Sequence, residues 1–398
     1  MKTSSFFGRR TALLITLLAT GSCSFAQSPE HSIASLLEVQ QYDRAIHIMA
    51  MLLLGFGFLM VFVRKYGRST LTATFMLVST AIPFYFVMSD SGFMGGADGE
   101  IKKLILAEFA AASLLIAAGA LLGRLKMHQY ILLGVLFVPF YKLNEWIVVE
   151  NALGILKTGV VDTGGSIVIH AFGALFGLGA AMTMTNKKEL EKPIEADATS
   201  DRYSMLGSMV LWIFWPSFCA ALVPVEAIPH TVVNVFLALS GSTLITYVLS
   251  ISIRGKIHIA DIANAALAGG VAIGSTCDFA GHGAAMLIGV MAGAVSTVGF
   301  ALVQDKQKYF LKTVDTCGVT NLHGMPGLLG GFAAIVVVKG IDSSSQLSGM
   351  LITVVIALFV GFLTGKILGL FGRKKNTYED TEEFVDAEEI VMDTAMVN

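Results

Sequence analysis

Long apolar segments alternate with short polar ones along most of the chain. About 20 apolar residues cross a bilayer as a helix, and eleven segments come close to that length. They are residues 44–63, 69–88, 101–123, 129–149, 161–184, 203–223, 228–252, 258–276, 283–303, 316–338 and 346–371. The apolar runs are continuous, so a transmembrane β-barrel is not expected. The pattern predicts an all-α polytopic membrane protein with eleven transmembrane helices.

Composition narrows the class further. Of the 398 residues, 55% are hydrophobic and only 14% are charged, whereas an ordinary soluble domain carries about 25% charged residues. A formal net charge of −2 offers no basic face to nucleic acid. The composition therefore argues against a soluble enzyme, a disordered protein and a nucleic-acid-binding protein. The cysteines show no metal-binding spacing, and no cofactor is expected.

The two ends of the chain differ from its apolar middle. Residues 1–26 combine a positive start with an apolar core at 11–20, which predicts a cleavable signal peptide. The alternatives are an uncleaved anchor helix and a lipoprotein site at Cys23. Residues 27–372 then form the transmembrane domain. Residues 373–398 are acidic, and they predict a solvated cytoplasmic tail or a contact arm for a neighbouring subunit or a regulator.

Lysine and arginine predict the orientation in the membrane. With eleven spans and the N-terminus outside, 17 of these side chains fall on the cytoplasmic side and 6 on the outer side. Cytoplasmic loops of membrane proteins carry such an excess of positive charge. We therefore expect a multi-pass protein of the cell (inner) membrane with a cytoplasmic C-terminus.

The chain contains an internal repeat. Residues 162–170 read DTGGSIVIH and residues 315–323 read DTCGVTNLH, at an offset of 153 residues. A second match at the same offset pairs Ala107–Ala112 with Ala260–Ala265. Each unit holds five helices, so the second copy is inverted relative to the first. The pattern predicts a 5+5 inverted repeat, spans 1–5 and 6–10, plus a last helix, as in transport folds whose site lies near the midplane.

The repeat predicts that His170 and His323 meet near the membrane centre. Ionisable groups at that depth usually line a functional path, and burial favours the neutral imidazole. Two neutral rings can share one proton and form a polar rail, which suits a small neutral molecule better than a bare Na⁺ or K⁺ ion. The alternatives are a separate helix–helix hydrogen bond for each histidine, or a zinc pair, for which the flanking residues offer no further ligand.

Two acidic residues begin the repeated segments. Asp162 and Asp315 each precede Thr and stand eight residues before a histidine. We expect each to cap the first turn of its helix, because its carboxylate can accept hydrogen bonds from free backbone N–H groups there. Such a cap also fixes the direction in which the histidine points.

Six segments between residues 42 and 372 resemble the ammonium transporter and Rhesus glycoprotein superfamily, and its Rhesus branch more closely. They are FGFLMVFVRKYG at 56–67, NEWIVVENAL at 144–153, DTGGSIVIHAFGALFG at 162–177, LWIFWPSF at 211–218, NAALAGGVAIG at 264–274 and DTCGVTNLHGMPGLLGG at 315–331. The resemblance implies a homotrimer in the lipid bilayer with one pore per subunit. It implies ammonia or ammonium as substrate, with methylammonium and CO₂ as further candidates.

The resemblance also implies roles for single residues. The twin pore histidines of the family fall on His170 and His323, and its two stacked aromatic gates fall on Phe109 and Phe218. The family aspartate before the first histidine falls on Asp162, and a vestibule acid of the Rhesus branch falls on Glu145. The serine that helps ammonium transporters bind the cation is Leu222 here, and no Trp occupies the matching outer position. A tight outer cation site is therefore not expected.

The hypothesis from the sequence is electroneutral passage of NH₃ after NH₄⁺ loses its proton. Moving an ion into hydrocarbon costs many kcal/mol, whereas a small neutral amine avoids most of that cost. Three alternatives remain: a CO₂ channel of the Rhesus type, an ammonium sensor, and an ion-coupled transporter using Glu108 and Asp261 as its only carboxylate candidates. An enzyme is not expected, because no Ser–His–Asp set or metal cluster is apparent.

Overall fold

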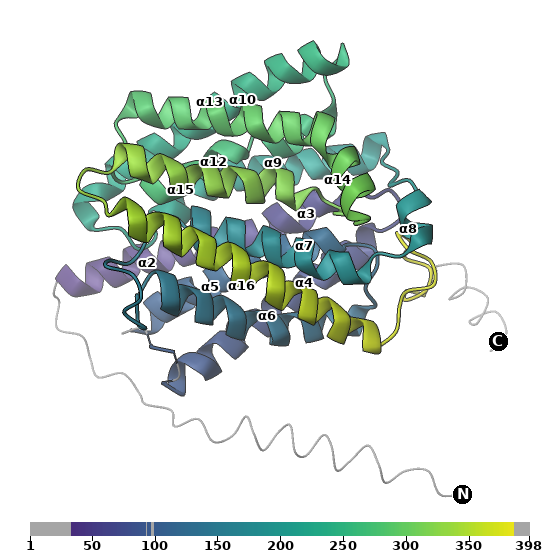
Figure 1. Cartoon of the computed structure of the whole chain (residues 1–398), viewed down its shortest axis with the longest axis horizontal. Helices are drawn as coiled ribbons and strands as arrows, with labels where there is room; N and C mark the ends of the chain where they lie inside the picture. Colours follow the sequence, from purple (N-terminus) through teal and green to yellow (C-terminus); the bar gives the residue numbers. More distant parts are fainter. Residues whose placement is uncertain (1–32, 93, 97–98, 386–398) are drawn as a thin grey trace, which may run out of the picture. The chain divides into compact units, whose positions relative to one another are not determined.

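The computed structural model describes residues 33–92, 94–96 and 99–385, and every regular element in these ranges is helical (Figure 1). Residues 1–39 form one unit, of which only helical residues 33–39 are described, and residues 40–398 form the other. The predicted signal peptide and the last part of the acidic tail lie outside the described residues. Everything below concerns the larger unit.

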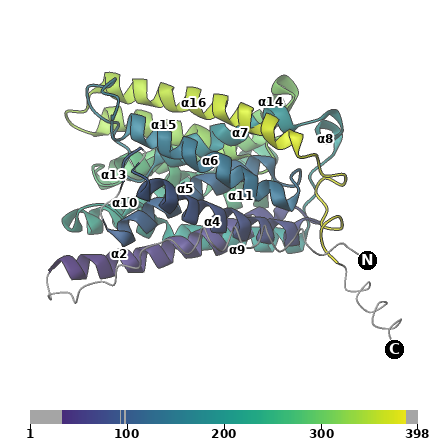
Figure 2. The same cartoon turned by 90° about the horizontal axis from the view of Figure 1, so that it is seen from below.

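Its long helices follow a common direction (Figures 1 and 2). In chain order the elements are α2 (Ile33–Ala50), η1 (Met51–Phe56), α3 (Gly57–Leu59), η2 (Met60–Phe62), α4 (Gly67–Asp90), α5 (Glu100–Leu121), α6 (Met127–Val148), η3 (Ser166–Ala171), α7 (Phe172–Met184), α8 (Lys187–Glu191), α9 (Ala198–Cys219), η4 (Val225–Ala227), α10 (Ile228–Arg254), α11 (Ile259–Ala265), α12 (Ala268–Ile273), η5 (Gly274–Thr276), α13 (His282–Val298), η6 (Gly299–Val303), α14 (Gln304–Leu311), η7 (Thr320–Gly324), α15 (Met325–Val337) and α16 (Ser343–Leu370). Helix α16 packs along α7, and α10 packs along α13 (Figure 2).

Ten helical segments of the described chain are long and apolar enough to cross a membrane. They match ten of the eleven predicted spans. The remaining one, the sixth, is α9, which has 22 residues but begins with polar side chains that include Asp201 and Arg202. The prediction of an all-α polytopic protein is confirmed.

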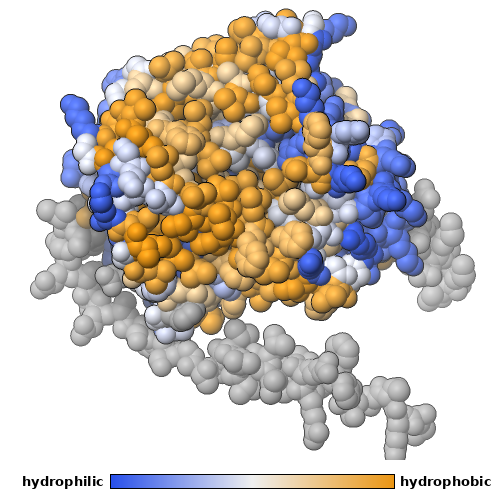
Figure 3. Space-filling model, in the orientation of Figure 1, coloured by the Kyte–Doolittle hydropathy of each residue, from blue (hydrophilic) through white to orange (hydrophobic). Residues whose placement is uncertain are grey.

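Apolar side chains also cover the outside of the bundle. The face drawn in Figure 3 carries a broad hydrophobic band over α13, α15 and α16, with hydrophilic residues gathered near α8. Large side chains of α15 and α16, such as Val336 and Leu351, are strongly exposed. Soluble monomers rarely expose contiguous apolar patches of this extent, so this surface fits contact with lipid or with other membrane helices.

The two copies of the repeated motif have the same local backbone. Gly165 and Gly318 are equivalent by the 153-residue offset, and both have positive φ, 75° and 64°. This conformation favours glycine, because a side chain would clash with the backbone. Each glycine is followed closely by a π-helical turn, η3 or η7. Both histidines therefore follow the same type of local turn.

The loops before these turns dock in a reciprocal way. The N–H of Gly164 donates to the carbonyl oxygen of Gly274, the first residue of η5, at 2.7 Å. The N–H of Cys317 donates to the carbonyl oxygen of Gly119 near the end of α5, at 3.2 Å. Each half of the repeat thus holds the loop of the other half, as expected for inverted copies related by a pseudo-two-fold axis.

Residues 373–385 fold back onto one end of the bundle, here called the tail side. The N–H of Tyr378 donates to the carbonyl oxygen of Gly123, at 3.0 Å. The carboxylate of Asp380 accepts hydrogen bonds from the N–H groups of Arg68 and Ser69, in the first turn of α4. Glu383 accepts from the N–H of Met127, which begins α6, at 2.6 Å. The acidic residues of this segment therefore satisfy the free donors of two helix starts.

We expect Asp380→Ala to loosen this end of α4. Losing a helix cap costs about 1 kcal/mol, so the amides of Arg68 and Ser69 should exchange hydrogen about fivefold faster. Hydrogen-exchange mass spectrometry of the peptide covering the start of α4 measures this. Glu379→Ala is the control, because Glu379 forms a half-exposed ion pair with Lys192 and should have little effect. Equal exchange in both variants would contradict the capping role.

Candidate functional site

Two buried histidines meet in the middle of the bundle. His170 lies in η3 and His323 in η7, and their side chains are 2% and 3% exposed. Their Nδ1 atoms are 3.2 Å apart, and the rings stack with an interplanar angle of 12°. One Nδ1 therefore carries a proton and donates a hydrogen bond to the other Nδ1. Nε2 of His170 has no hydrogen-bond partner among the described residues.

The two histidines are hydrogen-bonded to each other, which bears on the alternative of a separate hydrogen bond for each histidine. Because each Nδ1 contacts the other ring, the histidines are not tied separately across a helix interface. Among the described residues, no group of three or more His, Cys, Asp or Glu side chains could hold a metal ion.

Asp162 organises the turn that carries His170. Its carboxylate accepts hydrogen bonds from the N–H groups of Ile167 and Val168, and from the Oγ of Ser275 at 2.6 Å. Asp315 does the same in the second copy, where it accepts from the N–H groups of Val319 and Thr320.

Further rings extend the stack on both sides of the histidines. Trp215 of α9 lies against His170 with ring centroids 5.5 Å apart, and Phe56 of η1 lies 6.3 Å from His323. A glycine at position 270 makes room for Trp215, since a Cβ there would lie 2.5 Å from the indole. Neither ring was among the residues expected from the sequence. A Trp inside the LWIFWPSF segment was the only available signal for Trp215.

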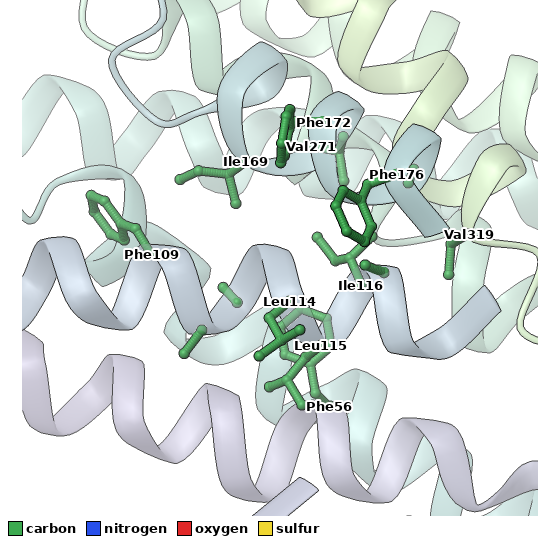
Figure 4. Close-up of a cluster of buried hydrophobic side chains, with 14 of the residues drawn as sticks. Phe56, Phe109, Leu114, Leu115, Ile116, Ile169, Phe172, Phe176, Val271 and Val319 are labelled. Carbon is green, nitrogen blue, oxygen red and sulfur yellow. The ribbon is translucent and has the colours of Figure 1, made fainter. Parts of the chain in front are cut away.

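Phe109 and Phe218 form an aromatic pair beside His170. Their ring centroids are 4.6 Å apart, and Phe218 lies 6.2 Å from the ring of His170. Both are buried. Figure 4 shows Phe109 beyond Ile169 at one end of an apolar cluster that continues through Ile116 toward Phe56. The aromatic pair therefore separates the histidines from the cavity described next.

A cavity of about 380 Å³ opens beyond this aromatic pair. It lies at the end of the bundle opposite the tail side, and is here called the Glu145 cavity. Its lining includes Leu106, Phe109, Tyr141, Glu145, Val149, Val160, Val161, Asp162, Thr163, Gly165, Val168, Ile169, Leu222, Asp278 and Phe279. Three carboxylates thus share one small space with Leu222, whose side chain offers no oxygen. Asp315 is not part of this lining, although its motif repeats that of Asp162.

Asp278 is the carboxylate that sequence reasoning missed. Its Oδ1 accepts a hydrogen bond from the Oγ1 of Thr163, at 2.9 Å. Burial raises the pKa of Asp278, while this hydrogen bond and nearby His230 oppose the rise. Asp278 follows η5, so its place in the cavity depends on the docking of that segment beside the loop at 162–165.

The other buried acids do not line this cavity. Asp261 forms a two-point ion pair with the guanidinium of Arg254, at 2.7 and 3.0 Å, and also accepts from Ser250. Glu108 is buried in α5 and has no hydrogen-bond partner among the described residues. Because Asp261 is already paired with Arg254, Glu108 and Asp261 do not form the carboxylate site that an ion-coupled transporter would need.

The fold and this site define a polytopic membrane protein with two stacked histidines buried among apolar side chains. The family model described as "Ammonium Transporter Family" matches residues 40–390, and the chain belongs to that family. It is a family of transporters, not of enzymes.

Relatives and solved structures place the chain nearer the Rhesus proteins. "Ammonium transporter Rh type B" of Homo sapiens is 37% identical over 309 residues, which cover 75% of this chain and 66% of that protein. The solved structure of Nitrosomonas europaea Rh50 is 51% identical, with a TM-score of 0.87 over 92% of this chain and 97% of that one. A structure described as "Sensor Amt Protein" covers 89% of this chain and 98% of its own, with a TM-score of 0.76; at 18% identity it shows the fold alone.

Proposed function

We propose that this protein is an ammonia channel: ammonium enters the Glu145 cavity, loses its proton there, and neutral NH₃ passes along His170 and His323. The observation that carries the proposal is the Nδ1–Nδ1 contact of two buried histidines among largely apolar neighbours. Their rail offers weak hydrogen bonds to NH₃ and no cage of oxygens for a metal cation.

The aromatic pair supports the passage of a neutral molecule. Phe109 and Phe218 are in contact, so a species passing between them must leave its water shell behind. An ammonium ion would lose many kcal/mol of hydration, and K⁺ would lose a comparable amount without being able to shed its charge. Ammonia avoids most of this cost, and selectivity against K⁺ follows.

The Glu145 cavity supports the first step. Its carboxylates, Glu145, Asp162 and Asp278, attract a cation from solution. Leu222 supplies no oxygen ligand, which fits weak retention of ammonium. The released proton returns to water on the cavity side, and NH₃ is reprotonated by water after it leaves the tail side.

This proposal includes a location and an assembly. The Glu145 cavity faces outside and the tail side faces the cytoplasm, in accord with the distribution of Lys and Arg. The chain lies in the inner membrane as a homotrimer with one pore per subunit. The exposed apolar band of Figure 3 supports burial in lipid and against neighbouring subunits.

Stopped-flow recording of internal pH in proteoliposomes tests the proposal. After an inward ammonium gradient, vesicles that contain the protein should become alkaline several times faster than empty vesicles. A separate CO₂ jump should give equal acidification rates in both. Ammonium-driven rates equal to those of empty vesicles would overturn the proposal, and a response to CO₂ alone would favour the gas channel.

A further inference from the structure

A buried lysine lies beside the Glu145 cavity. Lys142 precedes Glu145 by three residues on α6, so the two side chains are neighbours on the helix surface. Lys142 is 3% exposed. No carboxylate of the described residues lies within ion-pair distance of its Nζ. Lysine is almost never this buried without an ionic partner. The burial of Lys142 therefore suggests that its charge has a function.

Tyr85 connects this lysine to the vestibule acid. Lys142 Nζ lies over the Tyr85 ring, 4.9 Å from the ring centroid. The hydroxyl of the same ring donates to Oε2 of Glu145, at 3.4 Å. The ammonium group is thus stabilised by the ring face, and its charge acts on Glu145 without forming an ion pair.

We propose that Lys142 is a positioning residue that keeps the hold of Glu145 on ammonium weak. This inference rests on the proposed function. The Lys142 charge draws the Glu145 carboxylate toward Tyr85 and also repels any cation bound beside that carboxylate. The repulsion favours loss of a proton from ammonium, because NH₃ carries no charge for Lys142 to repel. Ammonium should therefore bind weakly and give up its proton to cavity water readily.

The test measures the initial ammonium-driven pH change against ammonium concentration in proteoliposomes. Lys142→Met keeps the apolar stem and removes the charge. A unit charge at this range in a partly solvated site changes cation affinity by about tenfold. We expect Lys142→Met to lower the half-saturating concentration about tenfold and to reduce the maximum rate. Lys142→Arg keeps the charge and should behave like the unchanged protein.

A double variant separates the charge effect from packing. In Glu145→Gln no carboxylate holds a cation beside Lys142, so adding Lys142→Met should shift half-saturation much less than it does alone. Lys142→Gln gives the same readout if methionine impairs folding. An unchanged half-saturation in Lys142→Met or Lys142→Gln, or an equal shift in Lys142→Arg, would overturn the role of Lys142. Unchanged protein that fails to exceed empty vesicles would instead count against the proposed function.

Discussion

Replacing His170 with alanine should reduce the ammonium-driven pH change by about tenfold or more. The substitution leaves Nδ1 of His323 without the partner it now contacts at 3.2 Å. A hydrogen bond between His170 and the permeating NH₃ is worth about 0.5–1.5 kcal/mol, and 1.4 kcal/mol on a barrier is tenfold in rate. The alanine also removes half of the polar rail that we propose for the passage of NH₃. Stopped-flow pH recording in proteoliposomes measures the effect.

The second histidine provides the internal control. His323→Ala should be impaired to a similar extent, and the double variant should lose much less than the product of the two single losses. The reason is that both substitutions remove one shared hydrogen bond. Two single variants that conduct as well as the unchanged protein would show that the pair is not the path. Losses that multiply in the double variant would contradict a shared bond.

Asp162→Ala should destabilise the protein more than any other substitution in the Glu145 cavity. Its carboxylate accepts from two backbone N–H groups and from Ser275, and an alanine leaves all three without their acceptor. A buried donor left without an acceptor costs about 1–3 kcal/mol, so for three of them we expect a total loss of at least roughly 3 kcal/mol. Thermal unfolding in detergent, followed by size-exclusion chromatography, detects a loss of this size as a large drop in Tm.

Asp162→Asn is the matched variant. The amide keeps the shape and one acceptor oxygen, so its loss of stability should be clearly smaller than that of the alanine. Both variants should also conduct poorly, because the turn that holds His170 loses its anchor. An alanine variant that melts within a degree or two of the unchanged protein would contradict the anchoring role of Asp162.

The pairing of His170 with His323 could be predicted from the sequence, because the two copies of the repeat share identical residues at key positions. The shared D-T-x-G-x-x-x-x-H pattern and its 153-residue offset place His170 and His323 at equivalent positions, and an odd number of spans requires that the copies be inverted. The spans follow from continuous apolar runs, which the bilayer demands whatever the tertiary packing.

Other parts of the site depend on packing between segments that are not equivalent in the repeat. Trp215 and Phe56 reach the histidine pair, and Asp278 reaches the Glu145 cavity, only because α9, η1 and the segment after η5 converge there. No local pattern encodes that convergence. The two aspartates illustrate the same limit. Asp162 and Asp315 share one motif, yet only Asp162 opens onto the Glu145 cavity.

The tail shows a further limit of composition. A run of acidic residues predicts solvation, since repelling charges rarely pack. Asp380 and Glu383 instead find the free N–H groups at the starts of α4 and α6, which are positions where a carboxylate is favoured. Which carboxylate meets which helix start depends on the end-to-end arrangement of the bundle, and this is fixed only by the folded chain.

The central claim is that the permeating species is neutral, and an imposed membrane potential tests it most directly. Proteoliposomes are loaded with K⁺, and valinomycin with different external K⁺ concentrations sets potentials of either sign. The initial ammonium-driven pH change is then recorded at a fixed ammonium gradient. Passage of NH₃ predicts a rate that is independent of the potential after subtraction of empty vesicles. A rate that rises when the interior is made negative would show that charge crosses with the substrate and would contradict the account.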